Sequence, residues 1–350
     1  MDTALPLALS TLVSPMTIFF ALGVAFAAAA RGVALPPFLA RTLAVLMLFA
    51  IGVKGGASLA EHGLDGAVLT TILSGALLSI ALTLIAFVAL DRATILGRQD
   101  AAAVAAHYGS ISIVTFATMT MLLKAEGVGY DGWMVAVAAT MEVPAILTAL
   151  ILARLAVPAA TPALAPAVAL TAGGAATGPG AFSGAAAGMR EACAGIFQAR
   201  PILLLVGAFA LGWIAGEMGA DWQENVAYGF FPMVLCLFLL DLGLMVGRRL
   251  GRLFRRFDPR LALFAVLMPL AGAMLGLMTG QALGLGVGNT ALLAALAASA
   301  SYLAAPATLR VALPEARPEL YLTLSLCLTL PFNLILGLPL YLFLASMFAG

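Results

Sequence analysis

The chain has 350 residues and a net charge of +1; 63% of the residues are hydrophobic and only 9% are charged. The mean hydropathy is +1.10. A water-soluble domain is excluded, because its surface needs more polar side chains than this sequence holds. The small net charge gives no indication of nucleic-acid binding, and the chain contains no metalloprotease, Walker or dinucleotide motif.

Apolar runs near the ~20 residues needed to cross a bilayer recur from end to end. They predict an all-α membrane protein with ten transmembrane helices, at residues 14–30, 38–58, 66–90, 100–122, 132–156, 199–217, 228–247, 260–284, 290–309 and 320–346.

The arginines predict the orientation of these spans. The loops after spans 1, 3, 5, 7 and 9 contain all of them: Arg31, Arg41, Arg92, Arg98, Arg154, Arg190, Arg200, Arg248, Arg249, Arg252, Arg255, Arg256, Arg260, Arg310 and Arg317. The opposite loops are acidic, with Lys124 as their clear cation. Arginine-rich short loops stay in the cytoplasm, so both termini are expected in the periplasm. The first fifteen residues lack a basic segment, which argues against a cleavable signal peptide. Many Ala and Arg with few Lys indicate a GC-rich bacterial genome and hence the inner membrane.

Residues 157–198 are rich in Ala, Gly, Pro and Thr and are expected to form a flexible cytoplasmic linker. They separate residues 1–156, a first repeat of five helices, from residues 199–350, a second. An odd number of spans in each half makes the second half inverted relative to the first. Three sequence matches favour this repeat: VLMLFAIGVKGG from Val45 with VLCLFLLDLGLM from Val234, the mid-span prolines Pro144 and Pro331, and AAHYGSIS from Ala105 with AASASYLA from Ala297. Inverted five-span halves are typical of alternating-access transporters with a site near the midplane.

Two polar stretches in the middle of spans 4 and 9 predict helix breaks. One covers residues 107–112 and is followed by Thr115; the other covers residues 299–302 and is followed by Pro306, which interrupts helices internally. Two half-helix N-termini meeting there would suit an anion, and freed carbonyls and hydroxyls would suit Na⁺. The alternative is that Gly and Ser only let the helices pack closely. The expected substrate-binding residues are Tyr108, Gly109, Ser110, Ser299, Ser301 and Tyr302, and the expected sodium-binding residues are Ser112, Thr115, Glu142 and Asn333.

Three ionisable residues lie deep in predicted spans, where they are costly. Glu142 precedes Pro144 by two residues and could serve a cation site, or could be protonated and cap a free carbonyl. Lys54 and Asp241 occupy nearby positions in the repeat and are expected to form an ion pair, as a gate or scaffold strut. Alternatively, Lys54 extends to the outer interface.

Buried histidine and cysteine side chains have simpler interpretations. His107 could titrate during transport, although a neutral, hydrogen-bonded histidine is the commoner outcome. Cys193, Cys236 and Cys327 have no metal or redox spacing. Sodium is therefore the only metal expected, as a coupling ion, and no cofactor is expected.

Four segments together resemble the SbtA-type sodium-dependent bicarbonate transporter family: FAIGVKGG (49–56), AAHYGSISIVTF (105–116), ATMEVPAILTALI (139–151) and ALAASASYLAAPATLRVALPEARPELYLTLSL (295–326). The resemblance covers essentially the whole chain. It implies ten spans in two inverted halves, crossed broken helices (spans 4 and 9) in a core domain beside a gate domain, a homotrimer, and sodium-coupled bicarbonate uptake.

The resemblance also has departures. Cyanobacterial members look richer in serine at both breaks, with an acidic residue in the second, where this chain reads SASYLAAPA; it looks like a non-cyanobacterial branch. Cyanobacterial members are regulated by a PII-like partner on the cytoplasmic face, but the linker here has no charged residue between Arg154 and Arg190, so this partner is not assumed.

The sequence leaves one close alternative function and argues against two other classes. A sodium-coupled carrier of a small organic carboxylate is the close alternative, because Tyr302 and nearby alanines leave room for an apolar body. A channel would need a continuous polar stripe rather than two local patches. An intramembrane enzyme would have to rely on His107 with Ser110 or Ser112, and a helix break does not hold such a pair in a catalytic geometry.

Overall fold

The computed structural model describes residues 14–30, 33–63, 65–94, 96–155, 200–218, 231–256, 258–302, 305, 309, 313 and 315–348, and regular structure there is entirely helical. The elements are α2 (Pro15–Ala29), α3 (Pro37–His62), α4 (Gly66–Ala93), α5 (Arg98–Gly109), α6 (Ile113–Ala125), α7 (Met134–Leu155), α9 (Arg200–Glu217), α11 (Phe231–Arg256), α12 (Pro259–Ala282), α13 (Val287–Ala297), α15 (Pro318–Leu322), η1 (Thr323–Thr329), α16 (Leu330–Phe332), η2 (Asn333–Gly337) and α17 (Leu338–Phe348). The linker at 157–198, Cys193 and Pro306 lie outside the described residues.

Each of the ten predicted spans contains helix. Seven helical segments of the described chain are long and apolar enough to cross a membrane, and α5 with α6 counts as one of them, as does the run from α15 to α17. Three shorter apolar helices, α2, α9 and α13, occupy the remaining spans. The protein is a multi-pass membrane protein.

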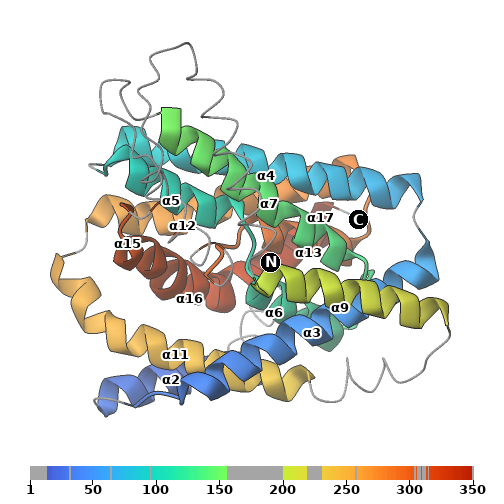
Figure 1. Ribbon diagram of the computed structural model, residues 1–350, viewed down its shortest axis with the longest axis horizontal. Helices are drawn as coiled ribbons and strands as arrows, with labels where there is room; N and C mark the ends of the chain where they lie inside the picture. Colours follow the sequence, from blue (N-terminus) through green and yellow to red (C-terminus); the bar gives the residue numbers. More distant parts are fainter. Residues whose placement is uncertain are drawn as a thin grey trace, which may run out of the picture.

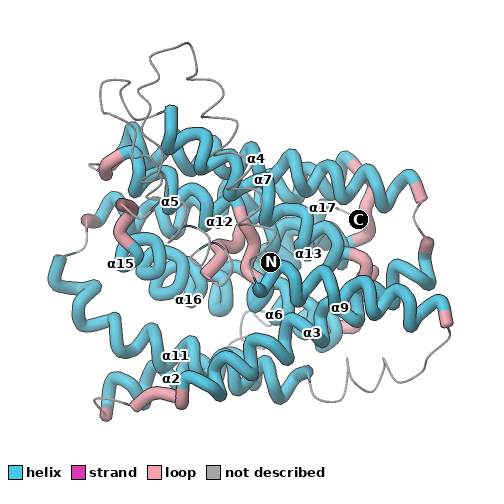
Figure 2. The backbone as a smooth tube through the Cα atoms, in the orientation of Figure 1, coloured by secondary structure: helices cyan, strands magenta, loops and turns pink. Residues whose placement is uncertain are grey.

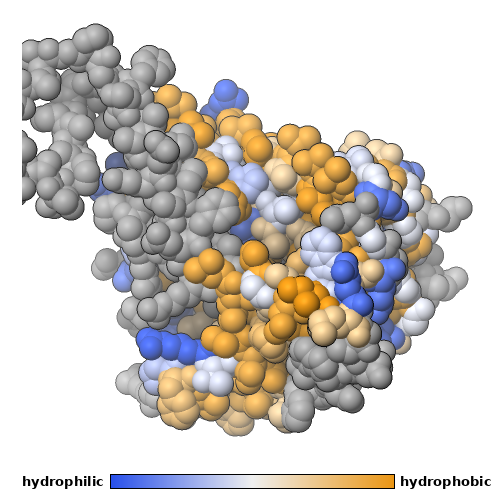
Figure 3. Space-filling model, turned by 45° about the vertical axis from the view of Figure 1, so that its right-hand side comes forward, coloured by the Kyte–Doolittle hydropathy of each residue, from blue (hydrophilic) through white to orange (hydrophobic). Residues whose placement is uncertain are grey.

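The outer surface is apolar, as lipid contact requires. Large side chains such as Leu77, Leu155, Leu263 and Met278 are exposed along the long helices. Figure 3 shows broad apolar areas on the face turned to the viewer. Exposure on this scale would mark an interaction surface in a soluble protein, and here it marks the lipid-facing sides of the spans.

Helices α2, α3, α9 and α11 form a four-helix unit along one edge of the molecule (Figure 1). In this unit α3 packs along α9 and α2 packs along α11, so each pair joins the first half of the chain to the second. Glycines permit the close approach: a Cβ on Gly56 would lie 1.8 Å from the Phe209 carbonyl oxygen, and one on Gly23 would lie 2.2 Å from that of Leu240. Small residues at such crossings are a common means of helix packing in membranes.

The remaining helices form a second group, which we call the core unit: α4 to α7, α12, α13 and the run from α15 to α17. Here α4 packs against α5 and α7, and α12 packs against α13 and η1. Every residue from 101 to 120 is buried, including both sides of the first break. Figure 2 shows non-helical segments in the middle of the molecule, between these helices. The broken span therefore runs through protein and not along lipid.

The two mid-span prolines act differently. Helix α7 continues through Pro144 from Met134 to Leu155. The last span instead widens into the π-helical segments η1 and η2 on either side of Pro331, an adjustment that accommodates local loss of regular helix hydrogen bonds.

Candidate functional site

The first break separates α5 from α6 at residues 110–112. Ser110 ends α5 with an extended backbone (ψ 169°), and the Ser112 hydroxyl caps α6 by accepting a hydrogen bond from the Thr115 N–H at 3.2 Å. Gly109 is required for packing, since a Cβ there would lie 1.8 Å from Thr83 Oγ1 on α4. The prediction of a break in span 4 is confirmed, and the first turn of α6, whose N–H groups lack intrahelical acceptors, begins inside the protein.

The second break follows α13, which ends at Ala297. Residues 298–302 are not helical, and the Ser301 hydroxyl accepts a hydrogen bond from the Ala305 N–H at 3.4 Å. Here the glycine belongs to the neighbouring helix: a Cβ on Gly272 of α12 would lie 2.1 Å from the Ala297 carbonyl oxygen. The start of this break agrees with the prediction for span 9, while most of residues 303–314, where the second half-helix is expected, lie outside the described residues.

The two breaks contact one another directly. The Ser112 N–H donates to Ser299 Oγ at 2.8 Å, and the Ser301 N–H donates to the His107 carbonyl at 2.8 Å. The Ser299 hydroxyl in turn donates to the Leu296 carbonyl at 2.8 Å. Predicted residues far apart in sequence are thus brought to one buried place.

Four buried polar atoms at this place have no hydrogen-bond partner within the described structure: His107 Nε2, Ser110 Oγ, Glu142 Oε2 and Tyr302 OH. The Ser110 hydroxyl lies next to the Glu142 carboxyl, and the Tyr302 hydroxyl lies next to Ser112. Buried polar groups normally have partners, so a cluster of exceptions indicates a bound ion, water or substrate. Hydroxyl and carboxylate oxygens at Ser110 and Glu142 fit a hard cation such as Na⁺.

His107 presents an acceptor to its buried surroundings. Its Nδ1 lies 2.7 Å from the Ala103 carbonyl; since a carbonyl only accepts, Nδ1 carries a proton, and in the neutral ring Nε2 is then an unprotonated acceptor. The ring stacks on Tyr321 with centroids 4.3 Å apart.

Tyr108 and Asn333 hold the structure around the breaks. The Thr329 hydroxyl donates to the Ala265 carbonyl, so the Tyr108 hydroxyl, 2.7 Å away, donates to Thr329. The Asn333 amide donates to the Ala298 carbonyl at 2.9 Å, and its oxygen accepts from Tyr341 at 2.8 Å. Both side chains anchor the break to the helices around it, and their direct binding of substrate or sodium stays a prediction.

Lys54 and Asp241 do not pair in the described structure. Lys54 donates instead to the Tyr130 hydroxyl, and the charged group that acts on buried Asp241 is Arg248. The role of Lys54 and Asp241 as a gate or scaffold strut stays a prediction.

Two further residues at the site come from α4. Ser79 donates to the Met141 carbonyl at 2.5 Å, one residue before Glu142, and Thr83 packs on Gly109 while it donates to the Ser79 carbonyl. Both are buried. The signal in the sequence was a Ser and a Thr four residues apart in the middle of the span, a spacing that places them on one helix face. The described residues contain no group of three or more His, Cys, Asp or Glu side chains that could hold a metal ion.

The family model of the Na⁺-dependent bicarbonate transporter superfamily matches residues 15–346. A search of curated proteins found no match to the chain. The family match extends across both breaks and nearly all described helices.

Proposed function

Because the chain belongs to the Na⁺-dependent bicarbonate transporter superfamily, we propose that it is a secondary active transporter that carries bicarbonate into the cell with Na⁺ by alternating access. The observation that carries this proposal is the direct contact between the two broken spans, beside four buried polar atoms that have no partner in the described structure. An ion pair of cargo and coupling ion would satisfy these atoms and would neutralise its own charge, which lowers the cost of holding either ion in low dielectric.

The two ions have separate places in this proposal. Na⁺ binds beside the Ser110 and Glu142 oxygens, with Ser112 and Thr115 close by in sequence. Bicarbonate lies towards the first turn of α6, whose dipole favours an anion, with the Tyr302 hydroxyl as a donor. Ser299 and Ser301 hold the second break against the first.

Two hydrogen-bonded clasps support the inverted repeat. Asp100, the third residue of α5, accepts from the Arg317 N–H at 2.8 Å and from Arg317 Nε at 2.8 Å. Asn289, the third residue of α13, accepts from the Asp131 N–H at 2.8 Å and donates to Asp131 Oδ2 at 2.6 Å. In each clasp, the half-helix that precedes the break in one half (α5 or α13) is hydrogen-bonded to the segment just before the last span of the other half.

Equivalent residues of the two halves also keep one constant separation in sequence: Gly97 and Gly286 cap the half-helices, and Asp100 and Asn289, Ser110 and Ser299, and Ser112 and Ser301 follow in step. The helix packing repeats as well. In the pairs α2 with α11 and α9 with α3, the first span of one half packs along the second span of the other half. A pseudo-two-fold axis through the breaks would relate all of these pairs. With such an axis, rocking or sliding of the four-helix unit against the core unit gives equivalent inward-facing and outward-facing states.

The remaining features of the proposal rest on the charge pattern and the resemblance. The arginine-rich ends face the cytoplasm of a bacterial inner membrane and both termini face the periplasm. The resemblance supports a homotrimer and, through the alanine-rich second break, a non-cyanobacterial branch; a PII-like regulator is not assumed.

One alternative keeps the mechanism and changes the cargo to a small organic carboxylate. It is favoured by the second break, where Ala300 and Ala305 stand beside Tyr302 and leave apolar surface for a carbon skeleton.

The test is counterflow of labelled bicarbonate in proteoliposomes, with Na⁺ or K⁺ as the cation. The proposal predicts exchange that requires Na⁺ on the same side and is lost in the Ser110→Leu/Ser299→Leu variant. Exchange indifferent to sodium would remove the coupling. Sodium-dependent exchange of acetate or pyruvate without exchange of bicarbonate would select the alternative cargo.

A further inference from the structure

Among the described residues at the breaks, His107 Nε2 is the one unpartnered buried atom to which the proposed function assigns no contact. The His107 side chain is entirely buried, which disfavours a charged imidazolium. The Ala103 carbonyl holds a proton on Nδ1, and the stacked ring of Tyr321 limits rotation of the imidazole. In the neutral ring Nε2 is therefore a fixed acceptor that needs a donor.

His107 lies one helical turn before Ser110. The Ser110 N–H donates to the Ala106 carbonyl at 3.1 Å, so the helical spacing extends as far as Ser110, and the Cβ atoms of residues three apart lie about 5–6 Å from each other. The His107 carbonyl accepts from the Ser301 N–H at 2.8 Å, and Tyr302 follows Ser301. A small ion held between the breaks can therefore contact the His107 ring as well as the Ser110 and Tyr302 hydroxyls.

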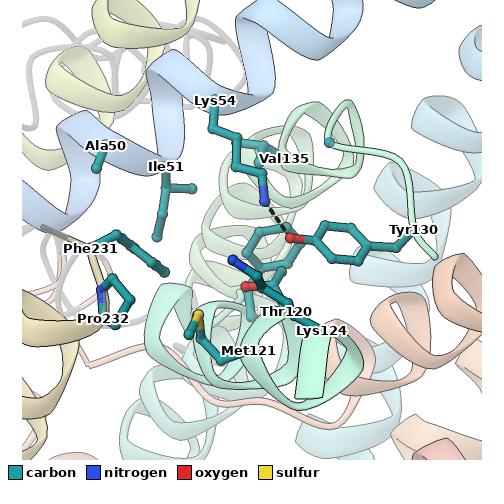
Figure 4. A pocket seen from close by; sticks show the side chains of 12 residues that line it. Ala50, Ile51, Lys54, Thr120, Met121, Lys124, Tyr130, Val135, Phe231 and Pro232 are labelled. Atoms are coloured by element: carbon teal, nitrogen blue, oxygen red, sulfur yellow. Dashed lines mark hydrogen bonds between the residues drawn. The ribbon is translucent and has the colours of Figure 1, made fainter. Parts of the chain in front are cut away.

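A pocket between α3, α6 and the start of α11 differs from the breaks. There the Lys54 ammonium donates to the Tyr130 hydroxyl (Figure 4). None of the described residues that line this pocket contains a buried polar atom without a partner. Apart from one nitrogen of Arg249, the unpartnered buried side-chain atoms of the described residues all lie at the breaks. The buried groups that call for a ligand are thus gathered at the breaks.

The four unpartnered atoms complement sodium bicarbonate. The Ser110 and Glu142 oxygens suit Na⁺, whereas an imidazole nitrogen is a poorer ligand for a hard cation. The Tyr302 hydroxyl can donate to a charged oxygen of the anion. Bicarbonate also carries one O–H group, which needs an acceptor, and His107 Nε2 supplies it. Nitrate has the same planar shape and charge without a hydrogen, so it would leave Nε2 unpaired. A site built for a hydroxyl rejects analogues that lack one for this reason.

We infer that His107 Nε2 accepts a hydrogen bond from the hydroxyl of bound bicarbonate and thereby selects bicarbonate over anions of similar size that lack a hydroxyl. The contact rests on the proposed function, because the same cargo makes it at the same site. It disfavours a simple organic carboxylate such as acetate, since the carboxylate oxygens and Nε2 are all acceptors.

Counterflow of labelled bicarbonate in proteoliposomes at saturating Na⁺ tests the contact, with nitrate as the competitor. In the wild type, the inhibition constant of nitrate should be at least tenfold higher than the half-saturating concentration of bicarbonate. His107→Phe keeps a flat ring against Tyr321 and removes the acceptor. It should raise the half-saturating bicarbonate concentration at least tenfold without weakening nitrate, so the ratio of the two constants should fall at least tenfold.

Tyr302→Phe is the matched control, because the Tyr302 hydroxyl would donate to an oxygen that both anions possess. It should weaken both anions and leave the ratio within about threefold of the wild-type value. Thermal unfolding in detergent identifies the variants that fold; if His107→Phe does not, His107→Leu also removes the acceptor and should lower the ratio in the same way.

Three results would overturn the role of His107: nitrate that inhibits the wild type as strongly as bicarbonate binds, an unchanged ratio in a folded His107 variant, or equal weakening of both anions by that variant. In each case bicarbonate counterflow itself persists. A wild-type protein without bicarbonate counterflow would instead defeat the proposed function.

Discussion

The two helix breaks have similar hydrogen-bonded frameworks but differ in the hydrogen bonding of one pair of equivalent serines. Ser112 and Ser301 both cap the half-helix that follows. Ser299, in the second break, is fully engaged: its hydroxyl donates to Leu296 and accepts from Ser112. The hydroxyl of its counterpart Ser110 has no hydrogen-bond partner among the described residues and lies beside the Glu142 carboxyl.

The asymmetry arises from one backbone contact. The Ser112 N–H donates to the Ser299 hydroxyl, so the repeat predicts that the equivalent Ser301 N–H donates to the Ser110 hydroxyl. The Ser301 N–H donates to the His107 carbonyl instead. Ser299 therefore holds the two breaks together, whereas the hydroxyl of its counterpart Ser110 has no partner in the described structure; the unpartnered oxygen of the second break is the Tyr302 hydroxyl. A symmetric scaffold can thus carry a single asymmetric site.

The largest expected effect is at Glu142, which has no acidic counterpart near Pro331. Glu142→Gln should raise the half-saturating sodium concentration of bicarbonate counterflow by about ten- to a hundredfold, since a contact to a charged group contributes roughly 1.5–3 kcal/mol. Thr329→Val is the matched control: Thr329 precedes Pro331 by two residues and its hydroxyl is already paired. An unchanged sodium requirement in Glu142→Gln would place the cation elsewhere.

Substitutions of Gly109 and Gly272 should distinguish the two breaks through the free energy of unfolding. Gly109→Ala and Gly272→Ala should each lower the free energy of unfolding by about 1–3 kcal/mol through overpacking. Thr83→Ala should restore part of the loss in Gly109→Ala, because the closest clash, at 1.8 Å, is with the Thr83 hydroxyl, while the Ser79 carbonyl oxygen at 2.9 Å remains. No side-chain change offers the same relief for Gly272→Ala, whose clash is with the Ala297 backbone. Thermal unfolding in detergent measures all three; equal rescue of both would contradict this account of the packing.

The serines should behave oppositely. Ser110→Ala removes an unpaired hydroxyl and should leave stability unchanged while sodium affinity falls. Ser299→Ala removes two hydrogen bonds and should destabilise the protein by about 1–2 kcal/mol with a smaller effect on affinity. Melting temperature and sodium titration of counterflow, measured on the same preparations, test the pair. The reverse pattern would make the second break the binding side.

The clasps should give the smallest effects. Asp100→Ala and Asn289→Ala should each cost about 0.5–1.5 kcal/mol. Salt should weaken the contribution of Asp100 more, because its partner Arg317 is largely exposed, whereas Asn289 is neutral. Identical salt dependence of the two variants would argue against this assignment of charge.

The fold was largely predictable from the sequence, because hydrophobic runs determine where helices cross a bilayer. The start of each break was predictable too, since Gly109–Ser110 and Ser299 interrupt apolar sequence with groups that prefer other partners than a regular helix. Side-chain pairing was not predictable. Lys54 meets Tyr130 rather than Asp241, and Tyr108 is an anchor for Thr329; both depend on how distant helices cross.

The two prolines show the same limit. Pro144 and Pro331 look equivalent in sequence, yet α7 passes through the first without interruption and the last span widens around the second. In the last span Asn333 reaches the Ala298 carbonyl, and Gly337 leaves room for the Asn333–Tyr341 bond. The local sequence shows the proline but not the contacts with neighbouring residues that decide whether the helix stays regular there.

A structure of the protein in lipid nanodiscs with sodium bicarbonate tests the central claim most directly. The account predicts non-protein density in contact with Ser110, Glu142 and Tyr302, with the Ser112–Ser299 bond intact. Density confined to another part of the molecule, with these three side chains paired to one another or to water in both the presence and absence of the salt, would contradict it.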